Sequence, residues 1–503
     1  MSFKTTQEQL DIIEAFKHTR VLKVNAAAGS GKTSTLKLLA EFNKQPSVYL
    51  AFNKVIASEA QDKFPQHVSC RTQHSLAYSV FGGMLQHKLK RVKGNVYINV
   101  AGTVSEIVKF YKIDDFNTSE EVIAARAIGS LVKQTVVRFQ FSKDETIAEH
   151  HIPKSDLKDV VKGLDDHRKN ELKRKVILYA NKLWKDRVDP LSPVLADHDT
   201  YLKLWQLSKP TLPYDIIYLD EAQDCNPVIY DVVKKQTHCK VVYVGDKHQS
   251  IYAFRQAINA MSRIDAPEKY FTKSFRFGQD IADLATFIIN GEMSIKGSEW
   301  INSCITDTLP SQYTMLFRTN AGLIDHAVTL IGQGKRVRCE VDTYKFEQQL
   351  KSAEALLFED LKNVKDETVA LYTKWSDLLD ALDEHLELKR VVNIVLSGRT
   401  RMYLKALARL KKQQGDYDIL LITAHKSKGM EWDNVVIADD FPLDKILDVS
   451  ADGNYNEQEV NLFYVACTRA KLNIKLPQEF IDTYNEHLDY LGDSTEHEDI
   501  DDK

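Results

Sequence analysis

The chain has 503 residues, of which 43% are hydrophobic and 27% charged, and its formal net charge at pH 7 is −4. This length exceeds what one hydrophobic core supports and predicts two to four domains. No apolar run approaches the roughly 18 residues needed to cross a bilayer, and the N-terminus lacks the apolar core of a secretory signal. We therefore expect a protein without a membrane partner that is cytoplasmic, nucleoid-associated or, for a viral chain, in the host-cell cytoplasm.

The six cysteines stand at positions 70, 225, 239, 304, 339 and 467, and no two have C-x-x-C spacing. A cysteine-based zinc or iron–sulfur site is therefore not indicated. We expect small buried side chains in a reducing compartment. Basic clusters occur at 88–93 and 168–175, and the second fits a helix with one charged face that is either solvated or in contact with phosphates.

Short apolar strands alternate with helical segments in two parts of the chain, which is typical of parallel sheets built from βαβ units. The predicted fold class is α/β, with two parallel-sheet domains that each carry a mainly helical insertion. The first sheet is predicted from Val21–Val24, Val48–Ala51, Ile216–Leu219 and Val241–Val244, and the second, beginning near Tyr270, from Tyr313–Phe317, Ile419–Thr423 and Val435–Ala438. The predicted boundaries are 1–83 and 198–268 for the first domain, 84–197 for its basic insertion, 269–337 and 415–478 for the second domain, 338–414 for its reduced insertion, and 479–503 for an acidic, disordered tail.

A glycine-rich turn follows the first predicted strand and precedes a predicted helix. Its residues are Ala28, Gly29, Ser30, Gly31, Lys32, Thr33 and Ser34. Such a turn presents backbone N–H groups and a helix N-terminus to phosphate oxygens, with Lys32 reaching the β- and γ-phosphates and Thr33 holding Mg²⁺. The full pattern asks for glycine where this chain has Ala26, so the loop alone leaves a ligand-free strand–turn–helix corner open.

An acidic pair follows the strand Ile216–Leu219. The carboxyl ends of parallel strands form the edge at which ligands bind, so Asp220 and Glu221 are expected there. Asp220 is the predicted second Mg²⁺ ligand, and Glu221 the base that orients the attacking water.

Further segments complete a set of motifs in a fixed order. They are Tyr49–Lys54, Cys70–Tyr78, Asp220–Asp224, Gly245–Arg255, Thr272–Arg276, Leu316–Asn320, Thr423–Trp432 and Asn461–Ala470. Together with the loop at Lys32, they resemble the UvrD/Rep/PcrA group of superfamily 1 DNA helicases, closest to the F-box DNA helicase branch, although no F-box is recognisable. The resemblance implies two RecA-like domains of the P-loop NTPase class, DNA-stimulated ATP hydrolysis with Mg²⁺, and movement along single-stranded DNA. Gln249-Ser250-Ile251-Tyr252 is similar to the 3′→5′ subgroup.

The resemblance also implies roles in the nucleotide site. Lys32, Arg276 and Arg469 would neutralise charge on the transferred phosphoryl group, Glu221 would act as the base, and Gln249 would sense the γ-phosphate. Gln9 would recognise adenine, Phe275 would stack on it, and Glu431 would contact the nucleotide. Core packing is the alternative for Phe275. Ser34 stands where some members have arginine, which leaves base selectivity open.

Single-stranded DNA is bound by aromatic stacking and basic contacts to phosphates. Tyr252 and Phe254 are the predicted stacking residues, with Phe254 at a position where the family commonly has tryptophan. The other positions that match strand-contacting residues are Phe52, Asn53, His74, Arg318 and His425. A hydrogen-bonded interior histidine is an equal alternative for His74.

The motifs leave two motor functions open, a helicase that unwinds duplex DNA and a translocase that removes proteins or remodels recombination or replication intermediates with little unwinding. A guanine-nucleotide switch requires Asn-Lys-x-Asp, and Asn53-Lys54-Val55-Ile56 fails at its last position. An inactive scaffold is disfavoured because Lys32, Asp220, Glu221 and Arg469 are present. The expected partners are single-stranded and forked DNA and replication or recombination proteins, and the expected isolated state is a monomer.

Overall fold

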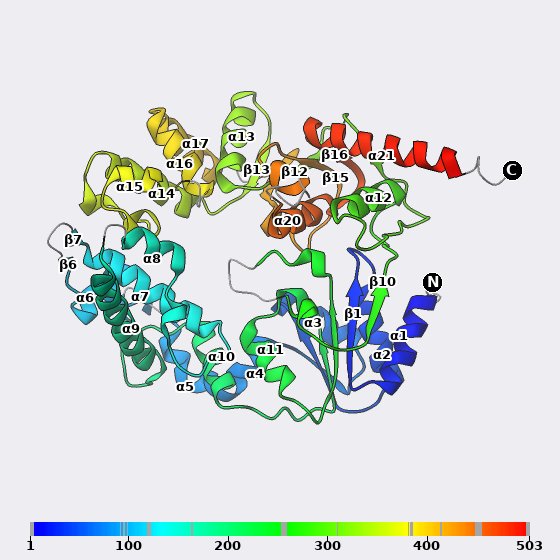
Figure 1. Ribbon diagram of the computed structural model, residues 1–503, viewed down its shortest axis with the longest axis horizontal. Helices are drawn as coiled ribbons and strands as arrows, with labels where there is room; N and C mark the ends of the chain where they lie inside the picture. The colour runs from blue at the N-terminus through cyan, green and yellow to red at the C-terminus, as the bar shows by residue number, and fades with distance from the viewer. Residues whose placement is uncertain are drawn as a thin grey trace.

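The computed structural model describes residues 5–498 except 91, 94–95, 98, 118–121, 162–163, 253–258, 309, 381, 383–385, 413–414 and 448–454. The described residues form two lobes, each built on a parallel sheet (Figure 1). Lobe 1 is the part built on the sheet that contains β1, and lobe 2 the part built on the sheet that contains β12. This arrangement confirms the predicted α/β class.

Among the described residues, lobe 1 has a six-stranded sheet in the order β10-β1-β9-β8-β2-β3. Its strands are β1 (Val21–Ala26), β2 (Ser47–Ala51), β3 (Val68–Thr72), β8 (Ile216–Leu219), β9 (Lys240–Gly245) and β10 (Glu268–Phe271). The strands β2 and β8 are buried along their whole length, as expected for parallel strands with helices on both faces. The surrounding helices are α1 (Gln7–His18), α2 (Lys32–Phe42), α3 (Lys54–Lys63), α4 (Gln73–Ala77), α5 (Gly83–Leu85) and α11 (Pro227–Lys234).

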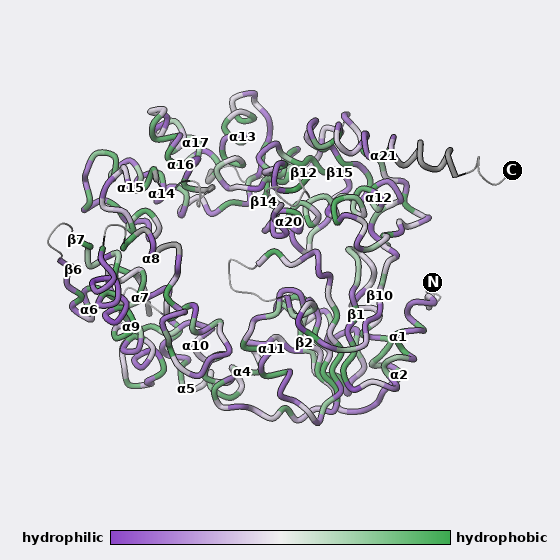
Figure 2. Tube along the Cα trace, viewed as in Figure 1, coloured by the Kyte–Doolittle hydropathy of each residue, from purple (hydrophilic) through white to green (hydrophobic). Residues whose placement is uncertain are grey.

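Lobe 2 has a second six-stranded parallel sheet within the described residues, in the order β11-β16-β15-β12-β14-β13. Its strands are β11 (Cys304–Ile305), β12 (Tyr313–Phe317), β13 (Val337–Glu340), β14 (Ile419–Thr423), β15 (Trp432–Ile437) and β16 (Ala470–Lys475). Its helices are α12 (Gln279–Ile288), α13 (Asn320–Gly332), α18 (Ala424–Ser427), α19 (Asp444–Leu447), α20 (Glu457–Cys467) and α21 (Gln478–Glu498). Figure 2 shows hydrophobic residues concentrated on the strands of both sheets.

Each lobe carries further helices. In lobe 1 they are α6 (Val104–Tyr111), α7 (Ala125–Gln140), α8 (Lys154–Val160), α9 (Asp166–Val188) and α10 (His198–Leu207), with the short antiparallel pairs β4 (Val92–Lys93)–β5 (Val96–Tyr97) and β6 (Phe116–Asn117)–β7 (Val122–Ile123). Buried residues of α7 and α9 such as Leu131 and Val176 share a core separate from the sheet. In lobe 2 the further helices are α14 (Thr343–Leu357), α15 (Trp375–Asp380), α16 (Leu386–Leu396) and α17 (Thr400–Lys412).

Four features differ from the sequence-based expectations. Residues 269–271, assigned to the second domain by the predicted boundary, belong instead to the strand β10 (Glu268–Phe271), which pairs with β1 in lobe 1. The strand β13 and helices α14, α16 and α17 fall in the predicted insertion 338–414, yet they share a core with the lobe 2 sheet. Residues 479–498 are helical rather than disordered, because Phe480 and Tyr484 lie one turn apart and are buried. Cys304 is exposed, because it lies on the edge strand β11.

The two lobes also meet through their added helices. Lys133 of α7 donates to both carboxylate oxygens of Glu367 at 2.6 and 2.8 Å. The guanidinium of Arg126, also on α7, donates to the carbonyl of Lys365 at 2.9 Å. Figure 1 shows α7 and α8 below this contact and α14 and α15 above it. The contact is a polar bridge between segments far apart in sequence.

We expect Lys133→Glu to weaken this bridge and lower the midpoint of thermal unfolding by about 1–2 °C, because a partly exposed ion pair contributes at most about 1 kcal/mol. Glu367→Lys in the same chain should restore most of the loss. Lys63→Glu, which breaks the Lys63–Glu59 pair within α3, is the control. If the double exchange is no more stable than Lys133→Glu alone, the bridge contributes nothing.

Candidate functional site

The turn between β1 and α2 has the backbone geometry of an anion site. Gly29 and Gly31 have φ of 73° and 79°, in the left-handed region that glycine adopts readily. A Cβ on Gly29 would lie 2.6 Å from the Cβ of Arg276, so a larger residue does not fit there. The buried Ser30 Oγ has no hydrogen-bond partner among the described residues. With no side chain capping the start of α2, the N–H groups at this turn fit a phosphate group.

Two oxygen donors suited to Mg²⁺ lie beside this turn. The Thr33 hydroxyl donates to Asp220 Oδ2 at 3.3 Å, and the Tyr49 hydroxyl donates to the same oxygen at 2.5 Å. Burial, reinforced by the charge of Glu221, raises the pKa of Asp220. A hydroxyl and a carboxylate are hard oxygen ligands of the kind Mg²⁺ binds, so Thr33 and Asp220 fit the metal that the sequence predicts.

Glu221 lies next to this pair in a strained backbone conformation. Its φ of 52° is uncommon for a residue with a side chain. Its carboxylate accepts from the side-chain amide of Gln223. Burial raises the pKa of Glu221, but the charges of Lys32 and then Lys428 outweigh burial and lower it overall. An ionised carboxylate at this position is able to act as a general base.

Side chains of lobe 2 close directly over the turn. The Tyr464 hydroxyl of α20 accepts from the backbone N–H of Ala28 at 3.3 Å and donates to Asp246 Oδ2 at 3.1 Å. Arg276 pairs with Glu431, with Nε and Oε2 separated by 2.9 Å, and donates to the carbonyl of Thr468 at 3.1 Å. The two lobes therefore meet at the predicted nucleotide site.

Arg469 follows α20 and is 1% exposed. Its guanidinium donates to the carbonyls of Val465 at 2.9 Å and Met430 at 3.2 Å, which fixes its position. Burial, reinforced by Arg276, lowers the pKa of Arg469 to about 9, whereas the charge of Glu221 raises it. This interaction couples a cation of lobe 2 to the predicted base of lobe 1.

Other predicted nucleotide-site residues have their own partners. Gln9 completes a capping box with Thr6 and donates to the Thr35 hydroxyl at 3.1 Å. The Gln249 amide donates to Asp246 Oδ2 at 2.8 Å. Phe275 is 43% exposed beside Gly31, which disfavours core packing and leaves its ring face accessible.

Aromatic residues predicted to contact DNA gather where the lobes meet. Phe52 and Tyr252 are stacked, with ring centroids 6.0 Å apart and an interplanar angle of 12°. Phe52 is 44% exposed. The Tyr252 hydroxyl donates to the carbonyl of His425 at 3.2 Å, which joins lobe 1 to lobe 2. Phe254 lies outside the described residues.

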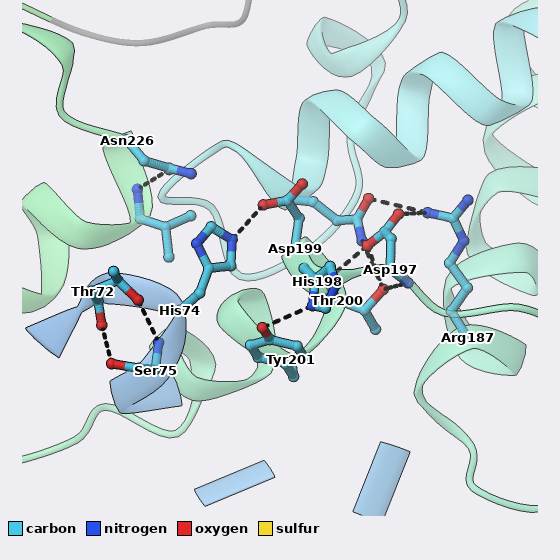
Figure 3. A network of polar contacts seen from close by, with 12 residues as sticks. Thr72, His74, Ser75, Arg187, Asp197, His198, Asp199, Thr200, Tyr201 and Asn226 are labelled. Carbon is cyan, nitrogen blue, oxygen red and sulfur yellow. Dashed lines mark hydrogen bonds and ion pairs between the residues drawn. The ribbon is translucent and has the colours of Figure 1, made fainter. Parts of the chain in front are cut away.

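The remaining predicted strand-contacting residues are held by protein partners. Asn53 caps α3 by accepting from the Ile56 N–H at 2.9 Å. The Arg318 guanidinium makes two 2.7 Å contacts with Glu459. Figure 3 shows His74 of α4 directed at Asp199 of α10, with His74 Nε2 and Asp199 Oδ1 separated by 3.0 Å. The interior-histidine alternative thus has a specific partner, although the His74 side chain remains 41% exposed.

Sequence reasoning assigned no role to Lys428, although it stands in a quoted motif. Its Nζ pairs with the Asp224 carboxylate and donates to the Gln249 carbonyl at 2.5 Å. The same atom lies 5.5 Å from the centroid of the Tyr252 ring. Tyr464 and Asp246 were also assigned no role. All three residues stand in motifs, but the sequence does not indicate which residue of the other lobe each of them contacts.

The family model described as "UvrD/REP helicase N-terminal domain" matches residues 5–265, and "UvrD-like helicase C-terminal domain" matches residues 418–474. The chain is 32% identical over 531 residues to F-box DNA helicase 1 of Gallus gallus, covering 96% of this chain and 50% of the relative. It is also 32% identical over 522 residues to F-box DNA helicase protein 1 of Schizosaccharomyces pombe, covering 94% of this chain and 57% of the relative. The chain thus spans about half the length of these relatives.

The matched regions contain the glycine-rich turn, the acidic pair and Arg469. No helix in the part of the chain that the structure describes is both long and apolar enough to cross a bilayer. Since the first model alone matches more than half of the residues and the two sheets supply the expected paired lobes, the chain belongs to the UvrD/REP helicase family.

Proposed function

We propose that this chain is an ATP-dependent DNA helicase that translocates 3′→5′ on single-stranded DNA and unwinds duplex. The observation that carries the proposal is the junction of the lobes at the glycine-rich turn, where Tyr464 of lobe 2 contacts Ala28 and Asp246 of lobe 1. A nucleotide bound there would contact both lobes. Its hydrolysis would then change how the lobes meet, which is a ligand-driven shift between two arrangements.

In this proposal each charged side chain at the nucleotide site takes part in phosphoryl transfer. Lys32, Arg276 and Arg469 neutralise the phosphate oxygens, while Glu221 accepts a proton from the attacking water. Thr33 and Asp220 would hold Mg²⁺, which would supply further charge neutralisation on the nucleotide. Gln9 and Phe275 bind the adenine, and Gln249 responds to the γ-phosphate. Selectivity for adenine through Gln9 requires its amide to leave Thr35 or share that contact.

The DNA strand would run across the junction, because the aromatic residues there join both lobes. The exposed Phe52 ring and Tyr252 offer stacking faces, and His425 lies directly against Tyr252. His74, Asn53, Arg318 and Phe254 remain predicted strand contacts. For Arg318 a phosphate would compete with Glu459 for the guanidinium.

The second candidate is a translocase that strips proteins or remodels replication or recombination intermediates with little unwinding. The curated relatives are named DNA helicases, which favours the unwinding function. The same proposal includes forked DNA as substrate and replication or recombination proteins as partners. It also includes a monomeric isolated state and a cytoplasmic location.

The test compares unwinding of 3′-tailed, 5′-tailed and blunt duplexes with ATP and Mg²⁺. We expect the 3′-tailed duplex to be unwound and the other two to remain paired. Lys32→Ala serves as the motor-inactive control. Displacement of a protein block without strand separation would favour the translocase, and preference for the 5′ tail would contradict the proposed polarity.

A further inference from the structure

We propose that Asp144, His150 and His151, in the segment between α7 and α8, form a binding site for a Zn²⁺-type metal ion. Asp144 Oδ2 lies 2.6 Å from His150 Nε2 and 3.2 Å from His151 Nε2. One donor atom from each of the three residues lies within 4.8 Å of the other two. The site is independent of ATP hydrolysis, because none of its residues contributes to the nucleotide site.

The direction of the two imidazoles is unusual for neighbouring residues. His150 and His151 are consecutive in a 3₁₀ turn at Glu149–His151, where successive side chains normally diverge by about 120°. Here their ring centroids are 4.1 Å apart, and both rings point toward the Asp144 carboxylate. Tetrahedral zinc with bonds of about 2.0–2.2 Å separates its ligand atoms by about 3.3 Å. The 3.2 Å between Asp144 Oδ2 and His151 Nε2 is close to that spacing, whereas the 2.6 Å between Asp144 Oδ2 and His150 Nε2 is a hydrogen-bond distance that a bound metal would lengthen.

Surrounding contacts hold the most buried ligand in place. His151 is 2% exposed, and its Nδ1 lies 3.2 Å from the Ala148 carbonyl. The same nitrogen accepts from the Ala148 N–H at 3.0 Å, so metal binding at Nε2 requires Nδ1 to carry the proton and donate it to the carbonyl, which is the usual arrangement around histidine ligands. The ring of His151 also packs edge-on against Phe139, with centroids 5.5 Å apart.

The backbone that carries Asp144 is anchored to α10. Lys203 Nζ donates to the carbonyls of Ser142 at 2.8 Å and Asp144 at 2.5 Å. The Gln206 amide donates to the carbonyl of Lys143 at 3.0 Å. A metal ion bound by Asp144, His150 and His151 would therefore link the segment after α7, which is bonded to α10, to the 3₁₀ turn before α8. Its expected role is to stabilise that junction.

The donor set discriminates between metals. Two imidazole nitrogens and one carboxylate suit Zn²⁺ and similar transition metals, whereas Mg²⁺ prefers oxygen ligands alone. Three protein ligands leave a further position for water. The alternative is an ordinary ion pair between Asp144 and His150, with His151 Nε2 bonded instead to the Ser142 hydroxyl at 3.1 Å.

The test is equilibrium dialysis of the metal-free full chain against Zn²⁺ alone, with the bound metal measured directly. We expect the wild-type chain to retain one equivalent more than Asp144→Asn or His150→Ala. Zn²⁺ should raise the wild-type unfolding midpoint by several degrees and leave both variants unchanged. His150 is exposed, so its replacement tests the site without opening the core around His151.

His18→Ala is the matched control, since His18 lies 3.0 Å from Glu14 in an exposed histidine–carboxylate pair. This variant should retain the same amount of zinc as the wild type. Co²⁺ in place of Zn²⁺ should give visible absorption bands in the wild type that are lost in His150→Ala. Equal zinc uptake by the wild type, Asp144→Asn and His150→Ala, or no uptake by the wild type, would overturn the proposal and leave an ion pair only.

Discussion

Replacing Glu221 by glutamine should slow DNA-stimulated ATP hydrolysis by about 10²–10⁴-fold while ATP binding stays nearly unchanged. The exchange keeps the size and planar shape of the side chain but removes the proton acceptor. Lys32 and Lys428 hold the pKa of Glu221 low, so the wild-type carboxylate is ionised near neutral pH. Single-turnover hydrolysis and fluorescent-nucleotide binding would separate the two effects.

Two further measurements sharpen this test. Circular dichroism should show an unchanged fold, because glutamine is able to keep the strained backbone and a hydrogen bond to Gln223. Gln223→Ala, which removes that partner without touching the proposed base, should slow hydrolysis by a smaller factor. Hydrolysis by Glu221→Gln at the wild-type rate would remove Glu221 from the mechanism and require another proton acceptor.

The second large effect is expected from Lys428→Met. Its Nζ contacts the Asp224 carboxylate and the Gln249 carbonyl and lies over Tyr252, so one side chain of lobe 2 touches segments of lobe 1 that are predicted to contact the nucleotide and the DNA. Removing one partner of a buried ion pair costs about 3–5 kcal/mol. We expect DNA stimulation of ATP hydrolysis to fall by about 100-fold, with a smaller change in the rate without DNA.

Lys426→Met is the matched control, because Lys426 is exposed on α18, two residues before Lys428. Asp224→Asn combined with Lys428→Met removes the unpaired carboxylate and should recover stability without restoring DNA stimulation. If Lys428→Met keeps the full ratio of stimulated to unstimulated rates, Lys428 is only a structural contact.

The same pair predicts a pH dependence. Burial raises the pKa of Asp224 to about 6, although Lys428 opposes this shift. The carboxylate is ionised above that pH and protonated below it, so the ion pair weakens as pH falls through about 6. DNA stimulation in the wild type should therefore decline in that interval, and Lys428→Met should show no such step.

The sequence was sufficient for the α/β class and for most strands. Apolar runs such as Ile216–Leu219 and Ile419–Thr423 are buried on both faces, so their composition alone identifies them. The short strand β10 was not predicted, and its residues 269–271 were assigned to the second domain, because Glu268–Phe271 has little apolar pattern and its partner β1 lies far away in the chain. The acidic composition of the last residues led to a prediction of disorder from 479 onward, although α21 has a buried face that includes Phe480.

By itself, the sequence determined the glycine-rich turn and the acidic pair after β8, because glycine conformation, strand polarity and charge are local properties. Only the tertiary structure decided that Tyr464 reaches Ala28, that Lys428 reaches Asp224 and that Asp144, His150 and His151 converge. The physical reason is that an ion pair or a ligand set depends on distances between atoms, and folding sets those distances between segments that the sequence keeps apart.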